Sequence, residues 1–112
     1  MDKSLMSGST ALLLLKLLES GDMYGYQMIE ELSRRSDNTF AFKAGTLYPV
    51  LHSLEEKDWI SAYEGITAGR TRRYYHLTEK GRHALTEKET EWKRYADAVH
   101  QVLKGGVSRG EA

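Results

Sequence analysis

The fold is decided by one stretch of sequence, FKAGTLYPVLHSLEEKDWI, residues 42–60, which holds the only proline of the chain. Its apolar residues recur at helical spacing and predict an amphipathic helix whose inward stripe is Leu47, Val50, Leu51 and Leu54. Pro49 falls inside this helix, where it removes an amide donor and crowds the carbonyl of Gly45, at a cost of about 3 kcal/mol. Glycine eases that crowding because its backbone can tilt away. Two starts are open, one near Lys43 with a loosened first turn and one at Tyr48 with FKAGT as a loop.

Two further helices are expected before this segment. The run SGSTALLLLKLLESG predicts a helix over residues 9–20, capped by Ser9 or Thr10 and ended by Gly21. Its leucines cover more than one face, which is typical of a central core helix. The run DMYGYQMIEELSRRSDN predicts a second helix over residues 24–35, which the polar sequence SDNT breaks. The inward face of that helix comprises Met28, Ile29 and Leu32.

After the proline segment the hydrophobic period changes. The runs WISAYEG and RTRRYYHL are rich in aromatic and β-branched residues, and the glycine-containing ITAGR separates them. They predict an antiparallel hairpin with a medium loop, in which Tyr75 and Leu77 face the core. The sequence LTEKG then opens a last helix, with Thr78 as its cap, that runs to about Leu103 before Gly105.

The order of these elements predicts a mainly α fold with a small β-hairpin. Three helices followed by a hairpin are the layout of a winged helix-turn-helix, in which the hairpin is the wing. We expect this domain over residues 1–77, a C-terminal dimerisation helix over residues 78–104, and a disordered tail over residues 105–112.

Composition excludes several classes of protein. The 112 residues contain no cysteine, so disulfides, thiolate catalysis and cysteine-based metal sites are ruled out. The four histidines show no metal-ligand spacing, and no nucleophile elbow or phosphate loop is present, so we expect no metal, no cofactor and no enzyme. The longest apolar run, residues 11–15, is far shorter than the ~20 residues of a membrane span. With no signal pattern at the start, we expect a cytoplasmic protein.

Three motifs give the chain a family resemblance. AGTLYPVLHSLEEKDWI, MYGYQMIEEL and GRTRRYYHLTEKG occur in order. They resemble the corresponding segments of PadR-type transcriptional regulators over about residues 5–104. The chain is most similar to the short subclass, which has one C-terminal helix. The resemblance implies that the proline-bearing helix starts before Pro49 and enters the DNA major groove. It also implies a homodimer built largely by the last helix.

The candidate DNA contacts lie on three elements. A recognition helix meets bases with its N-terminal residues, so its outward side chains are the first candidates: Lys43, Thr46, Tyr48 and His52. Net charge is zero, yet the hairpin concentrates a basic tip that suits a minor groove or phosphates: Arg70, Thr71, Arg72 and Arg73. The second helix begins with Tyr24 and Tyr26, and we expect at least one of these rings to pack in the core. Each of these side chains could instead be merely solvated.

The last helix is too long for the domain that carries it. About 26 residues make a helix of roughly 39 Å, whereas the rest of the chain spans about 30 Å. The overhang predicts a dimer interface along an apolar stripe: Leu85, Trp92, Tyr95, Ala96, Val99, Val102 and Leu103. In multidrug-responsive PadR-like proteins a tryptophan at the place of Trp92 stacks on flat aromatic ligands. By that resemblance an effector site would be lined by Trp92 with Leu15 or Leu18, and the alternative is plain dimer packing.

The leading hypothesis is therefore a homodimeric transcriptional repressor that binds an inverted repeat in double-stranded DNA. A small aromatic effector that moves the last helices would change the separation of the two recognition helices. The alternative is a protein-interaction module on the same fold, because a fold does not fix a function. Salt dependence separates the two, since DNA affinity falls steeply as ionic strength rises.

Overall fold

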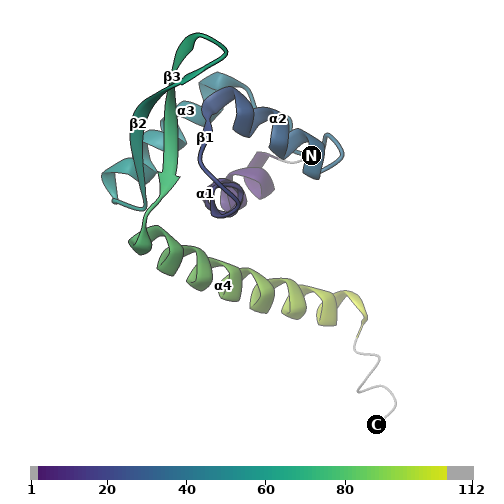
Figure 1. Ribbon diagram of the computed structural model, residues 1–112. Coiled ribbons are helices and arrows are strands. Elements are labelled where there is room, and N and C mark those ends of the chain that lie inside the picture. Colours follow the sequence, from purple (N-terminus) through teal and green to yellow (C-terminus); the bar gives the residue numbers. More distant parts are fainter. Residues whose placement is uncertain (1–2, 106–112) are drawn as a thin grey trace.

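Helix α1 (Lys3–Glu19) lies at the centre of the fold in the computed structural model, which describes residues 3–105 and the side chains from Ser9 onward. Helices α2 (Gly25–Arg35) and α3 (Ala44–Glu56) lie on one side of it, and α4 (Glu79–Leu103) runs along the opposite side (Figure 1). The element order is that of the predicted winged helix-turn-helix with a long C-terminal helix.

Helix α1 starts earlier than its sequence predicts. It begins at Lys3, so neither Ser9 nor Thr10 caps it, and Thr10 is instead buried within the helix. A hydroxyl residue that could cap a helix therefore lies inside this one. Its leucines reach several elements, and the fully buried ones are Leu14, Leu15, Leu17 and Leu18.

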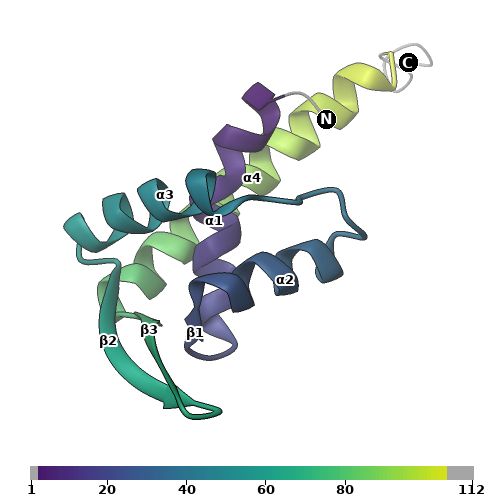
Figure 2. The same cartoon turned by 90° about the horizontal axis from the view of Figure 1, so that it is seen from above.

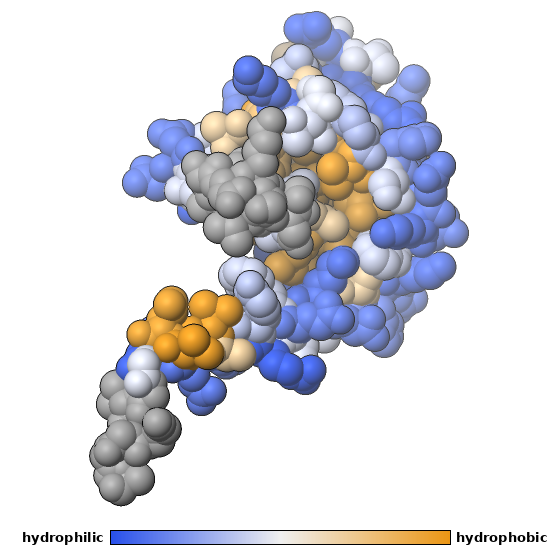
Figure 3. All heavy atoms as spheres, turned by 180° about the vertical axis from the view of Figure 1, so that it is seen from behind, coloured by the Kyte–Doolittle hydropathy of each residue, from blue (hydrophilic) through white to orange (hydrophobic). Residues whose placement is uncertain are grey.

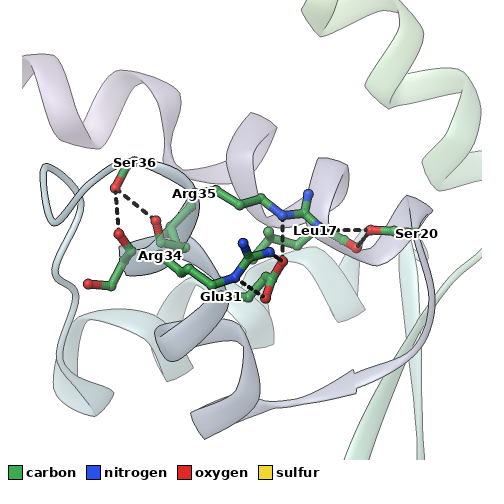
Figure 4. Close-up of polar contacts among 8 residues, drawn as sticks. Leu17, Ser20, Glu31, Arg34, Arg35 and Ser36 are labelled. Atoms are coloured by element: carbon green, nitrogen blue, oxygen red, sulfur yellow. Dashed lines mark hydrogen bonds and ion pairs between the residues drawn. The ribbon is translucent and has the colours of Figure 1, made fainter.

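The end of α2 is fastened to the end of α1 by polar contacts (Figure 4). Glu31 accepts hydrogen bonds from Arg34 and from Arg35, the latter at 2.7 Å from Nε. Arg35 Nη2 also donates to Ser20 Oγ at 3.0 Å, and Ser20 Oγ donates to the Leu17 carbonyl at 2.8 Å. The hydrogen bonds from Arg34 and Arg35 lower the pKa of Glu31 from 4.5 to about 2. Arg35, which Glu31 holds in place within α2, thus links the two helix ends through its hydrogen bond to Ser20, and we call Glu31, Arg34 and Arg35 the charged clamp.

Helix α3 begins before its proline, as the family resemblance implied. Lys43 is its N-cap in extended conformation, and the Lys43 carbonyl accepts from both Thr46 N and Leu47 N at 3.0 Å. The helix continues through Pro49 to Glu56, so the alternative start at Tyr48 is wrong. Gly45, whose carbonyl Pro49 cannot bond, is exposed, which leaves that carbonyl open to water.

The sheet has three antiparallel strands, in the order β1 (Met23–Tyr24), β3 (Arg70–Leu77), β2 (Ile60–Thr67). Strand β1 was not predicted, because two residues are too short to show a period. The hairpin loop is also tighter than expected. Only Ala68 and Gly69 connect β2 to β3, with φ of 52° and 76°, which are the positive values that a two-residue hairpin turn requires. Figure 2 shows the turn of this hairpin projecting beyond the helices.

Helix α4 is locked to the rest of the fold at its first turn. Thr78 Oγ1 accepts from Gly81 N at 2.9 Å and donates to the Asp58 carbonyl at 2.6 Å, which confirms the predicted cap. A Cβ on Gly81 would lie 2.0 Å from the Trp59 carbonyl oxygen, so this close approach requires glycine. The helix ends at Leu103 as expected, and of the tail predicted over residues 105–112 all but Gly105 lies outside the described residues.

Candidate nucleic-acid interface

The N-terminal half of α3 presents polar side chains on its outer face. Lys43, Thr46 and His52 are exposed, as the amphipathic pattern predicts. Tyr48 is 39% exposed, and a Cβ on Gly25 would lie 2.1 Å from its hydroxyl oxygen. Glycine at the first residue of α2 therefore leaves room for the Tyr48 ring, which lies against α2 while keeping one side open. The opposite face of α3 is buried through Leu47, Leu51 and Leu54.

The two tyrosines at the start of α2 lie differently. Tyr26 is exposed, whereas Tyr24 is the N-cap residue of α2 and also forms part of β1. The edge of the Tyr24 ring meets the Tyr74 ring at 5.5 Å between centroids. One of the two rings does pack, but on the outer face of the sheet and not in the core.

We call β2, β3 and the turn between them the wing. The three arginines of the wing have three different surroundings. Arg70 is exposed beside the turn. Arg72 lies with its Cζ atom 4.3 Å from the centroid of the Tyr24 ring. Arg73 Nη2 lies 2.9 Å from Glu55 Oε2 on α3. The sequence analysis did not predict this ion pair, although the negative charge of Glu55 and the positive charge of the arginines were a signal for it.

Polar groups at the base of the sheet's outer face converge on Asp22, which the sequence analysis missed. Tyr63 Oη donates to Asp22 Oδ2 at 2.6 Å, and His76 Nδ1 lies 2.8 Å from Asp22 Oδ1. Burial raises the pKa of Asp22, but the hydrogen bonds from Tyr63 and His76 outweigh it and the pKa is lowered. This cluster ties the loop before β1 to both strands of the wing. Counting the strand register from a two-residue turn would have placed Tyr63 beside Tyr74. Tyr63 and His76 then lie on the same face of the sheet, which would have suggested part of this cluster.

The apolar stripe of α4 divides at about residue 89. Leu85 is 1% exposed in the chain's own core, so it has no surface for a partner and its assignment to the dimer interface is wrong. Beyond it, Trp92 and Tyr95 are more than half exposed, with ring centroids 5.9 Å apart. The further exposed apolar residues are Val99, Val102 and Leu103, and Ala96 is half-buried among them. Figure 3 shows a hydrophobic patch near the C-terminal end of the helix.

The predicted effector-lining residues are not brought together. Leu15 and Leu18 are 0% and 2% exposed in the core, so neither presents a surface to a ligand. Their assignment is wrong because both side chains are buried within one chain. Trp92 is exposed on distal α4, the name used here for residues 90–103.

The part of the chain that the structure describes holds no group of three or more histidine and acidic side chains arranged to bind a metal ion. Among the same residues, no helix combines the length and apolar character that a bilayer crossing demands.

Comparison with known proteins reveals clear relatives. The model of the transcriptional regulator PadR-like family matches residues 14–87. The chain is 36% identical over 94 residues to an uncharacterized protein of Lysinibacillus sphaericus, which covers 83% of this chain and 86% of that protein. It is 34% identical over 87 residues to the transcriptional regulator Rv3488 of Mycobacterium tuberculosis, covering 78% of this chain and 75% of that one. A transcriptional regulator from Clostridium thermocellum has a similar structure, with a TM-score of 0.81, 28% identity, and coverage of 88% and 96%.

Proposed function

Because the chain belongs to the PadR-like family of transcriptional regulators, we propose that it is a homodimeric repressor that binds an inverted repeat in double-stranded DNA. The family consists of DNA-binding regulators of transcription without enzymatic activity, which agrees with the predicted absence of catalytic motifs. We place the activity of the protein in the cytoplasm, where a bacterial-type repressor meets the chromosome.

The observation that carries the proposal is that the N-terminal face of α3 and the basic tip of the wing are both exposed. Lys43 and Thr46 project from the first turn of α3, which is the part of a recognition helix that meets base edges. A lysine there suits a guanine or a phosphate, and a threonine suits a phosphate or a thymine methyl. Arg70 at the wing tip suits an adjacent minor groove or its phosphates.

The homodimer is proposed from distal α4. Its exposed aromatic and aliphatic residues form a stripe on a helix that a second copy can cover, and aromatic residues are enriched in such interfaces. Helix α4 lies on the side of α1 away from α2 and α3 (Figure 1). Pairing through distal α4 therefore leaves both recognition helices free for half-sites about 34 Å apart.

The effector remains part of the proposal, without Leu15 and Leu18. A flat aromatic compound would stack on Trp92, whose ring is 52% exposed, between the two copies. Such a ligand would shift the equilibrium between two separations of the recognition helices only if it bound one of them more tightly. The same surface without a ligand is plain dimer packing.

The test is footprinting on the DNA upstream of the protein's own gene, followed by affinity measurements on the protected duplex at several salt concentrations. We expect protection of an inverted repeat and a steep fall of affinity with salt. Lys43→Ala should weaken binding: loss of a phosphate contact lowers the slope of log affinity against log salt concentration by about one, whereas loss of a guanine contact relaxes the sequence preference. Lys80→Ala is the matched control, since Lys80 is exposed on the first turn of α4, and it should bind as the unmodified protein does.

Two outcomes would contradict the proposal. Absence of any salt-dependent binding to duplex DNA would favour the protein-interaction module. Binding of one copy per site, with protection of a single half-site, would remove the dimer and the inverted repeat.

A further inference from the structure

Resting on the proposed DNA-binding function, we propose that Arg72 and Arg73 are positioning residues that fix the wing against α2 and α3. Arg70 alone of the three arginines is then left to contact DNA. The sequence shows one basic cluster, whereas the structure places its members on different faces of the hairpin with different partners.

Arg72 is committed to the outer face of the sheet. Its guanidinium lies over the Tyr24 ring at 4.3 Å, a distance at which the charge and the planar group both interact with the ring. The Nε atom of Arg72 is shut off from solvent and finds no hydrogen-bond partner among the described residues. Gly65 lies directly opposite Arg72 in β2. Arg72 as a whole is half-buried, and a turn of its guanidinium toward a phosphate would break its stacking on Tyr24.

Tyr24 links Arg72 to the helix-turn-helix. It is the N-cap residue of α2, and its backbone N–H donates to Gln27 Oε1 at 3.3 Å. Its ring also meets Tyr74, which stacks on Tyr63 at 5.6 Å between centroids. The chain of contacts from Arg72 through Tyr24 therefore sets the position of the wing relative to the first turn of α2.

Arg73 makes the corresponding link on the other face of the strand. Its Nη2 atom lies 2.9 Å from Glu55 Oε2, and Glu55 belongs to the last turns of α3. Its guanidinium also lies 5.8 Å from the ring of Tyr75, which is buried. One arginine thus ties the wing to each helix of the helix-turn-helix, since Arg72 reaches α2 and Arg73 reaches α3.

Arg70 differs from both. It lies next to the turn, in register with Thr67, at the last pair of the two strands. It is exposed, as Arg73 is, but within residues 3–105 it has neither the acidic partner of Arg73 nor the ring contact of Arg72. Its charge is therefore free for a phosphate or a minor groove, and its position at the tip is set by the two arginines below it.

Replacement by lysine separates the two roles. Lysine keeps the positive charge and can hold a phosphate as a point charge, but it cannot stack as a planar group. Arg70→Lys should therefore behave as the unmodified protein does, whereas Arg72→Lys should release the wing. For Arg73 the informative change is Glu55→Gln. It removes an acid near the DNA and would strengthen binding if Arg73 were a phosphate contact, whereas loss of positioning weakens binding.

The experiment uses the full chain and a random-sequence duplex of about 30 base pairs, which spans about three helical turns. Amide hydrogen exchange of β2 and β3 is measured on the free protein, and affinity is measured across a salt series. We expect Arg72→Lys and Glu55→Gln to speed exchange in the wing and to weaken binding by about two- to fivefold, with an unchanged salt slope. Arg70→Lys should change neither the exchange rate of the wing nor the affinity for DNA. Arg70→Ala should lower the slope of log affinity against log salt concentration by about one.

The inference is overturned if Arg72→Lys leaves wing exchange as it was, or if Glu55→Gln tightens binding. It is also overturned if Arg72→Ala lowers the salt slope as much as Arg70→Ala does. Failure of the unmodified protein to bind the duplex at any salt concentration would instead reject the proposed function. The exchange measurement on the free protein would still decide whether Arg72 and Glu55 hold the wing.

Discussion

Apolar residues at helical spacing are buried in the body of the molecule, residues 9–89. On distal α4 such residues are exposed. In the body, leucines at helical spacing are buried, as Leu85 is on α4 itself. A few residues farther along the same helix, Trp92, Tyr95 and Leu103 keep helical spacing and are exposed. Helical spacing of apolar residues therefore predicts that a face will be buried, but it does not say whether the same chain or another one buries it.

The largest effect expected from this comparison is a pair of matched truncations on α4. Leu85→Ala should lower the free energy of unfolding by about 2–5 kcal/mol, because it leaves a cavity in the body. Leu103→Ala, the same change on the exposed end, should leave the unfolding of the monomer within about 0.5 kcal/mol. Denaturant unfolding at a concentration low enough to keep the chain monomeric measures both. Equal losses of stability for the two variants would contradict the distinction between the buried and the exposed part of α4.

A second change tests how α4 is joined to the body. Gly81→Ala would bring a Cβ to 2.0 Å from the Trp59 carbonyl oxygen, a backbone atom that cannot swing aside. Relief requires α4 to move, and we expect a loss of about 1–3 kcal/mol in thermal or denaturant unfolding. Gly45→Ala is the control, since nothing lies within 4 Å of the position that its Cβ would take, and it should not destabilise the fold. If Gly81→Ala did not change the stability, the first turn of α4 would not be held tightly against the backbone at Trp59.

The exposed end should matter for association and not for folding. Trp92→Ala should weaken self-association by about tenfold, because a large aromatic residue near the middle of an interface carries much of its energy. Sedimentation at several protein concentrations measures this change. Glu91→Ala, on the exposed residue beside it, is the control and should associate normally. A monomeric unmodified protein, or equal association of both variants, would contradict the proposed dimer.

Sequence alone predicted most of the helices and strands of the body. It predicted few of the contacts that its side chains make. Helix α3, the wing and the Thr78 cap follow from local patterns and the family resemblance. The early start of α1 and strand β1 do not, because no local sequence signal marks either of them. The candidate site divides in the same way. Exposure of Lys43 and Thr46 follows from helical spacing, whereas the stacking of Arg72 on Tyr24 depends on a strand pairing that no local signal shows.

Acid should weaken the body through its charged clamp. The pKa of Glu31 is lowered from 4.5 to about 2 by Arg34 and Arg35, so the folded state favours the ionised carboxylate. Its contribution to stability is fully present above about pH 4.5 and is lost as the pH falls towards 2. Glu31→Gln should flatten this part of the pH profile of unfolding, while Glu30→Gln, an exposed neighbour, should not. An identical profile for the two variants would mean that the clamp contributes nothing.

The smallest effect is expected at the border between the body and distal α4. Lys16 Nζ lies 3.1 Å from Glu89 Oε2 and 2.9 Å from Glu19 Oε1, and all three side chains are about half exposed. Surface ion pairs of this kind contribute about 0–1 kcal/mol and weaken with salt. The hydrogen bonds to Glu19 and Glu89 raise the pKa of Lys16, so the contribution is complete at neutral pH and is lost only as the pH rises above about 10.5.

Glu89→Gln should therefore cost less than about 0.5 kcal/mol at low salt and nothing measurable at high salt, with Glu87→Gln as the exposed control. Because the burial of Leu85 and the Thr78 cap still join α4 to the body, the loss of Glu89 should not release the helix. If Glu89→Gln instead destabilised the fold as strongly as Leu85→Ala, this ion pair, and not the burial of Leu85, would hold α4 in place. The position of the border would then be set by charge, and distal α4 could no longer be defined as the part of the helix that packing leaves uncovered.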